Sequence, residues 1–370
     1  MDTISIDMLT RRQLSLFLAG TPLLAQTPAP APDLDWRDAR DFTIEGLGYK
    51  DRKSPYDRLP ARAEALVRKA VWDLSRDSSG VLVRFTANTK AIHARWSVTN
   101  KNLASANITA VASSGLDLYA KTDAGRWHWL GIGRPMKYPE NTDVLAASIP
   151  AGQRDYMIYL PLRNGVTSLE IGVSKGAVIT KSAVRPSGLK PILFYGTSIT
   201  HGISASRAGM THVAMLGRMF NREVINLGFS GNGKMEPEVA ALVAELDPAV
   251  FVLDCLPNMN EKEINERAEA CVKTIRSAHP STPILLVEDR NYSDNFLNSG
   301  RRERNETNHK AMREVYAKMQ RDKVQHLFYL KADHLLGEDG EATIDGSHPT
   351  DLGFARQAAE FARVLKRILK

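Results

Sequence analysis

Cysteine and long apolar segments are both scarce in this sequence of 370 residues. The two cysteines, Cys255 and Cys271, are too few for the disulfide framework that small secreted domains use. We expect both to be buried apolar side chains rather than a disulfide or a metal site. After residue 25 no apolar run is long enough to cross a bilayer, so no membrane-spanning helix is predicted.

Clustered histidines and a continuous basic track are also missing. The nine histidines are dispersed, and no His-Glu-x-x-His pattern occurs, which disfavours a metal hydrolase, and we predict no cofactor. The net charge is +7 and the pI about 9.3, but basic residues gather only in short clusters at 301–304 and 366–367. Exposed helix faces explain these clusters better than a nucleic-acid partner does. The oligomeric state is left open.

The first 32 residues have the layout of a signal peptide and a Pro/Ala-rich spacer. Arg11 and Arg12 precede an apolar stretch over 14–25, and a Pro/Ala tract follows at 27–32. Residues 10–14 resemble a twin-arginine export motif. We therefore expect a periplasmic or secreted protein from which this segment is removed. The alternative is an N-terminus that is never cleaved.

Residues 33–184 are predicted to form a β-sandwich of the jelly-roll type. Short β-branched and aromatic runs, several with alternating polar residues, are separated by Gly, Asn and Pro. The expected strands are 81–86, 92–98, 156–160, 168–173 and 177–179, with one short helix around 61–71. The segment 185–190 is the expected linker.

Residues 191–370 are predicted to form a second, α/β domain. Apolar runs at 191–195, 224–227, 250–253, 284–287 and 327–330 alternate with expected helices around 208–221, 235–246, 262–278, 303–320 and 350–369. This alternation favours a doubly wound, flavodoxin-like parallel sheet of five strands. Its ligand site is expected at the carboxyl ends of the strands.

Polar residues and glycines follow these runs. Ser198 stands in the segment GTSITHG at 196–202, between a strand and a helix, where it is a candidate nucleophile or a simple helix cap. Gly231 follows the second run, and its bare N–H can approach a substrate oxygen or merely serve a turn. Asn258 follows the third run and offers a second donor to such an oxygen, or a cap.

Asp345 and His348 stand just before the last helix, three positions apart. One turn can hold them side by side, so that the carboxylate fixes the tautomer of the imidazole and the other ring nitrogen accepts the serine proton. His201 and His212 are the alternative bases. Other polar residues are left out of the catalytic set. Arg207 is expected to snorkel over its helix at the surface, with contact to a substrate oxygen as the alternative. Cleft-shaping or ion pairing is expected for Asp254, Glu288 and Asp289.

Taken in order on one scaffold, these segments resemble the SGNH (GDSL-like) hydrolase superfamily over roughly residues 190–370. The resemblance implies that Ser198 is the nucleophile and that Asp345 and His348 complete the triad. It also implies an oxyanion hole formed by the backbone N–H groups of Ser198 and Gly231 and the side chain of Asn258. Three positions depart from the family pattern, with Thr197 for Asp, Pro257 for Gly and Met259 for Asp.

The upstream segment 114–119, SGLDLY, with Trp127 and Trp129, resembles the Gly-x-Asp-Leu-Tyr sandwich domain that precedes some bacterial SGNH hydrolases. The architecture is similar to two-domain carbohydrate esterases. It implies a secreted serine esterase for short acyl esters, acetyl above all, on a small molecule or polysaccharide. A general short-to-medium-chain esterase or lipase is the alternative.

Two rivals come from other classes. The segment 228–234, GFSGNGK, fits a phosphate-binding loop, but Met235 stands where Ser or Thr is needed for magnesium. A non-catalytic carbohydrate-binding protein would use Tyr119, Trp127 and Trp129 as a stacking platform, although such aromatics more often pack in the core.

Overall fold

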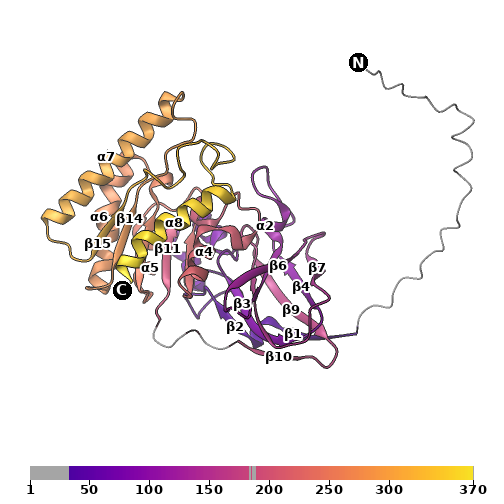
Figure 1. Ribbon diagram of the computed structural model, residues 1–370. Coiled ribbons are helices and arrows are strands. Elements are labelled where there is room, and N and C mark those ends of the chain that lie inside the picture. The colour runs from indigo at the N-terminus through magenta and orange to yellow at the C-terminus, as the bar shows by residue number, and fades with distance from the viewer. Residues whose placement is uncertain (1–32, 183–184, 186–188, 370) are drawn as a thin grey trace, which may run out of the picture. The chain divides into compact units, whose positions relative to one another are not determined.

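The computed structural model describes residues 33–182, 185 and 189–369, so the predicted signal peptide and half of the predicted linker lie outside the described residues. Residues from Leu34 onward belong to one compact unit that contains a β-sandwich and an α/β domain (Figure 1). Both parts of the predicted fold class are confirmed.

The sandwich consists of two antiparallel sheets. One has the strand order β1-β9-β4-β7, and the other has the order β10-β3-β8-β5-β6 with β2 paired to β3. The strands are β1 (Leu34–Asp38), β2 (Thr43–Glu45), β3 (Leu82–Asn88), β4 (Ile92–Val98), β5 (Leu116–Lys121), β6 (Trp127–Gly133), β7 (Glu140–Ala146), β8 (Arg154–Tyr159), β9 (Val166–Ser174) and β10 (Val178–Lys181). Inward-facing residues of both sheets, including Phe85, Trp96 and Ile171, form its core.

The helices of the sandwich region are short. They are η2 (Ala39–Asp41), η3 (Ala61–Ala65), α1 (Lys69–Ser75) and α2 (Ala110–Ser114). The single helix predicted around 61–71 is therefore wrong: the chain forms a 3-10 turn and then a separate helix.

The α/β domain contains a fully parallel sheet with the order β12-β11-β13-β14-β15, which is the flavodoxin-like order. Its strands are β11 (Ile192–Gly196), β12 (Val224–Gly228), β13 (Val250–Asp254), β14 (Ile284–Val287) and β15 (Leu327–Leu330). All five coincide with predicted apolar runs, because a strand buried on both faces must be apolar throughout.

Helices cover both faces of this sheet (Figure 1). They are α3 (Ser198–His201), η4 (Ala208–Met210), α4 (His212–Met219), α5 (Pro237–Ala244), η5 (Leu256–Asn258), α6 (Glu261–Ala278), α7 (Ser299–Arg321) and α8 (Asp351–Ile368). Leu193 and Tyr195 of β11 face the cluster that includes α5, α6 and α7, whereas Ile192 and Phe194 face the cluster that includes α4 and α8.

The sandwich packs directly on the α/β domain. Tyr119 and Tyr159 of the second sandwich sheet belong to the same apolar cluster as α4 and α8. Leu59 and Trp72, from the segment between β2 and β3, belong to the cluster on the opposite face of the parallel sheet. The sandwich side therefore contributes to both layers that hold the strand ends in place.

One predicted helix is interrupted near these contacts. The segment 208–221 is not continuous, because η4 ends before Thr211, whose extended backbone (φ −68°, ψ 149°) caps α4 instead. The Oγ1 of Thr211 accepts a hydrogen bond from the N–H of Ala214 at 3.2 Å. Gly209, inside the interrupted stretch, donates its N–H to Asp117 of β5 at 2.7 Å, a tertiary contact that helical periodicity does not reveal.

Candidate active site

Ser198 begins α3, separated by one residue from the end of strand β11. Thr197 caps the helix by accepting from the N–H of Ile199 at 3.3 Å, so the serine hydroxyl is not used as the cap. Gly196 is required at the strand end, because a Cβ there would lie 2.1 Å from Oγ1 of Thr200. The sequence thus forms a tight strand-to-helix turn that presents Ser198 at the carboxyl edge of the sheet.

His348 reaches this serine from the loop before α8. Its Nε2 lies 2.9 Å from Oγ of Ser198, and its Nδ1 lies 2.7 Å from Oδ2 of Asp345. If Nδ1 carries the proton and donates it to the carboxylate, Nε2 is free to accept from the serine hydroxyl. The structure therefore brings the three predicted residues into one hydrogen-bonded row.

The loop around Asp345 fixes the orientation of its carboxylate. The Oδ1 atom accepts from the backbone N–H groups of Ser347 and His348 at 3.1 and 2.8 Å. Partial burial works against the charged form, but the hydrogen bonds from the backbone and ring of His348 outweigh it, and the pKa of Asp345 lies below its ordinary value. Asp345 is therefore a carboxylate at neutral pH, able to stabilise a protonated imidazole.

Gly231 lies in a loop that follows β12 and adopts a φ of +70°, which favours glycine. The loop is anchored to the nucleophile strand, because Phe229 donates its N–H to the carbonyl of Gly196 at 2.9 Å. A Cβ on Gly231 would meet no described atom within 4 Å, so glycine serves the backbone conformation here rather than a lack of space.

Asn258 ends η5 and contacts the same loop. With its amide oxygen turned toward the loop, it accepts from the N–H groups of Asn232 and Gly233 at 3.0 and 3.1 Å. This orientation follows from the hydrogen-bond pattern, since the oxygen then faces two donors. It leaves the Nδ2 group of Asn258 available as a donor.

The two alternative bases lie in the interior. His212 is fully buried, with its ring stacked on Phe354 and Phe361 at centroid distances of 5.7 and 5.3 Å. His201 is also fully buried, with Nε2 at 3.4 Å from Asp77. Burial pushes the pKa of both imidazoles well below the ordinary value. Among the described residues, it is the ring of His348 that contacts the hydroxyl of Ser198.

Arg207 does not lie free on the surface as predicted. Its Nη1 atom donates to Oδ2 of Asp117 at 2.9 Å and to the hydroxyl of Tyr119 at 2.5 Å. Asp117 and Tyr119 belong to the Gly-x-Asp-Leu-Tyr segment of the sandwich. That segment therefore holds the chain that follows the nucleophile helix.

A second link connects the sandwich to the loop of His348. Thr109 donates to the carbonyl of Ser206, and the hydroxyl of Ser206 donates to Asp351 at the start of α8. His348 precedes Asp351 by three residues. The sandwich is thus connected to both segments that supply the hydrogen-bonded row.

Arg58 is a residue near the site that sequence reasoning missed. It is buried, and its Nη1 donates to the carbonyls of Asn226 and Gly228 at 3.0 and 2.8 Å. Desolvation lowers the pKa of this guanidinium to about 10. Arg58 therefore holds the end of β12, from which the Gly231 loop emerges, but nothing in its local sequence distinguishes it from a surface arginine.

The remaining acidic residues form ion pairs. Asp254 is paired with Arg290, Glu288 with Arg313 and Asp289 with Arg304. Ion pairing was one of the two roles expected for these three carboxylates, and in this role they stabilise the scaffold at the ends of the strands.

Residues needed for the rival phosphate-binding loop and aromatic platform are ion-paired or buried. Lys234, the expected phosphate ligand, is paired with Glu263 at 3.0 Å. Tyr119 is buried and Trp127 is partly buried against the core, which leaves Trp129, 50% exposed, as the accessible aromatic of the suggested platform.

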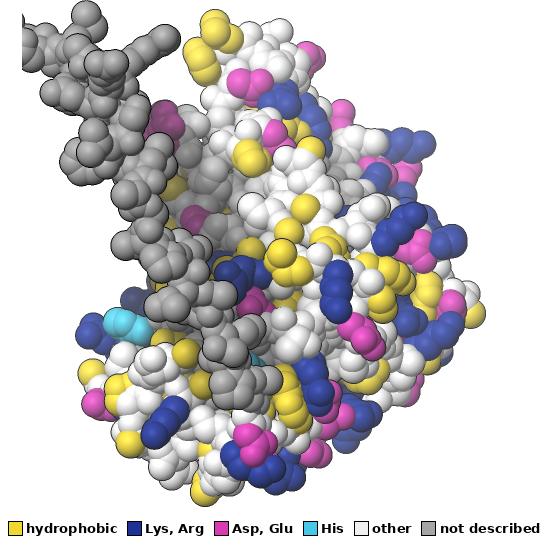
Figure 2. All heavy atoms as spheres, turned by 90° about the vertical axis from the view of Figure 1, so that its right-hand side faces the viewer, with side chains coloured by type: hydrophobic (Ala, Val, Ile, Leu, Met, Phe, Trp, Pro, Cys, Tyr) yellow, Lys and Arg dark blue, Asp and Glu magenta, His cyan; other side chains and the backbone are white. Residues whose placement is uncertain are grey.

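No group of His, Cys, Asp and Glu that could hold a metal occurs within 33–182, 185 and 189–369. Over the same stretch no helix has the length and apolar character to cross a bilayer. Cys255 and Cys271 are both buried and free. Basic and acidic side chains are interspersed on the face shown in Figure 2, as exposed ion-paired surfaces are.

Comparisons with known proteins bear on the whole architecture. Residues 189–366 match the GDSL-like Lipase/Acylhydrolase family, and residues 34–179 match the N-terminus of the SGNH-hydrolase type of esterase. A protein of Bacteroides ovatus described as a GDSL-like lipase is 36% identical, with 91% of this chain and 98% of that chain covered and a TM-score of 0.87. The chain belongs to the GDSL-like lipase/acylhydrolase family. It is therefore a serine hydrolase that acts on esters.

More distant structures share the fold of this GDSL-like hydrolase. A salicylyl-acyltransferase from a tetracycline biosynthetic pathway is 18% identical, with 90% and 97% of the two chains covered and a TM-score of 0.72. A family two carbohydrate esterase from Cellvibrio japonicus is 14% identical, with 92% and 99% covered and a TM-score of 0.59. No curated protein sequence matched the chain. The fold of this chain thus recurs in both structures despite the low sequence identity.

Proposed function

We propose that this enzyme hydrolyses short acyl esters, acetyl esters above all, on carbohydrate, with Ser198 as nucleophile, His348 as base and Asp345 as its partner. The observation that carries the proposal is the hydrogen-bonded row from Ser198 through His348 to Asp345. Such a row is the arrangement that activates a serine hydroxyl in acyl transfer.

In the first half-reaction, Nε2 of His348 takes the proton of Ser198 as Oγ attacks the ester carbonyl carbon. The imidazolium then returns this proton to the departing alcohol oxygen as the carbon–oxygen bond of the ester breaks. In the second half, His348 takes a proton from water, whose oxygen attacks the acyl-enzyme. The acid leaves and Ser198 recovers its proton.

The negative oxygen of each tetrahedral intermediate needs donors fixed in advance. We propose the backbone N–H groups of Ser198 and Gly231 and the Nδ2 group of Asn258 for this role. Two sets of hydrogen bonds support a rigid arrangement of these donors. The Gly231 loop is bonded to the carbonyl of Gly196, and Asn258 is bonded to Asn232 and Gly233.

Asn258→Ala should lower kcat by about 10²–10³ with little change in KM, because a donor to the developing oxyanion is lost. The variant Asn258→Asp separates this role from a structural one, since it keeps an oxygen that can accept from the loop but supplies no N–H. We expect a similar fall in kcat for both variants in steady-state kinetics. A change confined to KM would mean that Asn258 only positions substrate.

Two further observations support the proposed acyl and alcohol specificity. The predicted export signal would bring the enzyme to extracellular polymers, and the resemblance to two-domain carbohydrate esterases favours a sugar alcohol. We also retain residues 1–32 as a removed signal peptide, 33–184 as the sandwich domain, 185–190 as the linker and 191–370 as the catalytic domain. A short-to-medium-chain esterase or lipase is the second candidate, because a tunnel for a longer acyl chain can be assembled from residues far apart in sequence.

A screen of p-nitrophenyl esters of graded chain length, run beside acetylated polysaccharides, tests this specificity. We expect the highest kcat/KM for acetyl esters and release of acetate from at least one glycan. A higher kcat/KM for octanoyl esters, with no acetate from any glycan, would favour the second candidate.

A further inference from the structure

A second feature at the carboxyl edge of the sheet is a cavity of about 610 Å³ formed by the loops that follow β14 and β15. Tyr292, Asn295 and Phe296 line it from the first loop, and Asp333 and Glu338 line it from the second. Its volume falls within the range of about 300–1,000 Å³ that is usual for small-molecule sites. None of the residues in the active-site row lines it.

The cavity shares a wall with the loop of the proposed base. Ser293, which lines the cavity, donates its backbone N–H to the carbonyl of Gly346 at 2.9 Å. Its hydroxyl lies 2.8 Å from that of Thr343, which also accepts from the N–H of Gly346 at 3.1 Å. Gly346 stands between Asp345 and His348. A molecule in this cavity therefore lies next to the loop that carries the acid and base.

The lining has a particular chemical character. It contains carboxylates, amides, a hydroxyl and aromatic rings, and none of the described lining residues is Lys or Arg. Asp339 is paired with Arg356, whereas no ion pair involves Asp333 or Glu338 among the described residues. A site with acceptors and no cation is unsuited to phosphate, sulfate or an acidic sugar. It suits a ligand that donates several hydrogen bonds.

Phe296 supplies an accessible aromatic ring at this cavity. Its side chain is 71% exposed, so the ring is accessible to a ligand. Tyr292 differs, because Arg301 and Arg304 lie over its ring at 4.7 and 5.7 Å. A flat apolar ring beside hydrogen-bonding groups matches the two-sided surface of a pyranose, whose C–H groups face an aromatic ring while its hydroxyls donate to acceptors.

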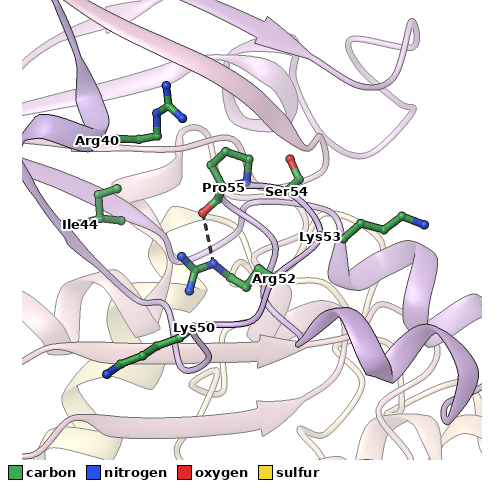
Figure 3. A pocket seen from close by; sticks show the side chains of 7 residues that line it. All are labelled: Arg40, Ile44, Lys50, Arg52, Lys53, Ser54 and Pro55. Atoms are coloured by element: carbon green, nitrogen blue, oxygen red, sulfur yellow. Dashed lines mark hydrogen bonds between the residues drawn. The ribbon is translucent and has the colours of Figure 1, made fainter.

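A cavity in the sandwich region fits this ligand less well. The one shown in Figure 3, of about 440 Å³, is lined by Arg40, Lys50, Arg52 and Lys53 and belongs to the sandwich region. It lacks an aromatic ring and has four cations, so its chemistry points to an anion. No contact connects it to the loop of His348 among the described residues.

We propose that the cavity between the β14 and β15 loops binds a neutral sugar unit of the substrate's alcohol part, with Phe296 as the stacking surface and Asn295, Asp333 and Glu338 as hydrogen-bonding partners. This inference rests on the proposed carbohydrate esterase function. It assigns the leaving alcohol to the side of the Asp345–His348 loop, where His348 must deliver the proton to the departing oxygen.

The test compares wild-type enzyme with Phe296→Ala and Asp333→Asn on two substrates, an acetylated xylo-oligosaccharide and p-nitrophenyl acetate. For the oligosaccharide we expect KM to rise about tenfold in each variant, the size of a single strong contact, with kcat nearly unchanged. For p-nitrophenyl acetate, which has no sugar, kcat/KM should stay at the wild-type value. Leu297→Ala is the matched control, because Leu297 is 82% exposed next to Phe296 but does not line the cavity.

The outcomes separate the two proposals. If wild-type enzyme deacetylates the oligosaccharide and Phe296→Ala does so with unchanged KM, the sugar site is wrong while the proposed function stands. If wild-type enzyme hydrolyses p-nitrophenyl acetate but releases no acetate from acetylated oligosaccharides, the carbohydrate function and the sugar site both fail. A rise of the oligosaccharide KM in Leu297→Ala equal to that in Phe296→Ala would also overturn the assignment to the cavity.

Discussion

Ser198→Ala should reduce kcat for ester hydrolysis by about 10⁴–10⁶ while the protein remains folded. The loss follows from removal of the attacking oxygen, since neither His348 nor water at the same position can form the acyl-enzyme. The fold should tolerate the change because Thr197, not Ser198, caps α3. Steady-state kinetics on p-nitrophenyl acetate and a thermal melt give the two readouts.

The control for this variant is Ser277→Ala, which removes an exposed hydroxyl on α6 far along the chain from the row. It should retain wild-type kcat. His348→Ala should cost about as much as Ser198→Ala, and the double variant should cost little more than either, because the two residues act as one unit. Hydrolysis near the wild-type rate in Ser198→Ala would refute the proposed nucleophile.

Asp345→Asn should reduce kcat by about 10³–10⁴ with a smaller effect on KM. An asparagine can keep accepting from the backbone N–H groups of Ser347 and His348 through its oxygen, which directs its NH₂ group toward Nδ1 of His348. That nitrogen must then be the acceptor, so the proton moves to Nε2, which can no longer take the proton of Ser198. The side chains keep their positions, but the imidazole of His348 carries its proton on Nε2, where it cannot act as the base.

The same substitution has a stability readout with a defined sign. The pKa of Asp345 is lower in the folded enzyme than its ordinary value of 3.8, so its charge stabilises the fold above that pH, and this contribution is lost as the pH falls. Acid unfolding of Asp345→Asn should therefore depend less steeply on pH than that of the wild type in this range. A variant with full activity and an unchanged acid profile would show that Asp345 neither orients nor stabilises His348.

The sequence was most informative where function depends on local pattern. The five strands of the parallel sheet were predictable because each is apolar throughout, and the positions of Ser198 and His348 follow from the ends of strands and the start of α8. The two-domain fold was also predictable from a change in pattern. Near residue 190, strands with alternating apolar and polar residues give way to fully apolar strands separated by helices.

Tertiary contacts explain what the sequence could not predict. Arg207 looks like a solvent-exposed arginine until Asp117 and Tyr119, about ninety residues earlier in the chain, are seen to bind it. The interruption of the 208–221 helix depends on the same carboxylate, which takes the N–H of Gly209. Arg58 holds carbonyls of β12 from a segment with no distinguishing pattern. Such long-range pairs leave no periodic signal.

The candidate bases for Ser198 were separated by burial rather than by sequence. His201 is closer to Ser198 along the chain than His348 is, yet its ring is buried beside Asp77. The turn formed by 345–348 brings a residue 150 positions away to within 2.9 Å of the hydroxyl. Proximity in sequence is therefore a poor guide to the base of a doubly wound hydrolase.

Covalent labelling with a fluorophosphonate, followed by peptide mass mapping, tests the central claim most directly. The reagent reacts with a serine only when an adjacent base activates its hydroxyl, and the adduct reports the nucleophile itself. We expect one equivalent of label per chain, located on Ser198, with loss of esterase activity in step with labelling and no label in His348→Ala. Label on another residue, or full activity after complete labelling of Ser198, would contradict the account.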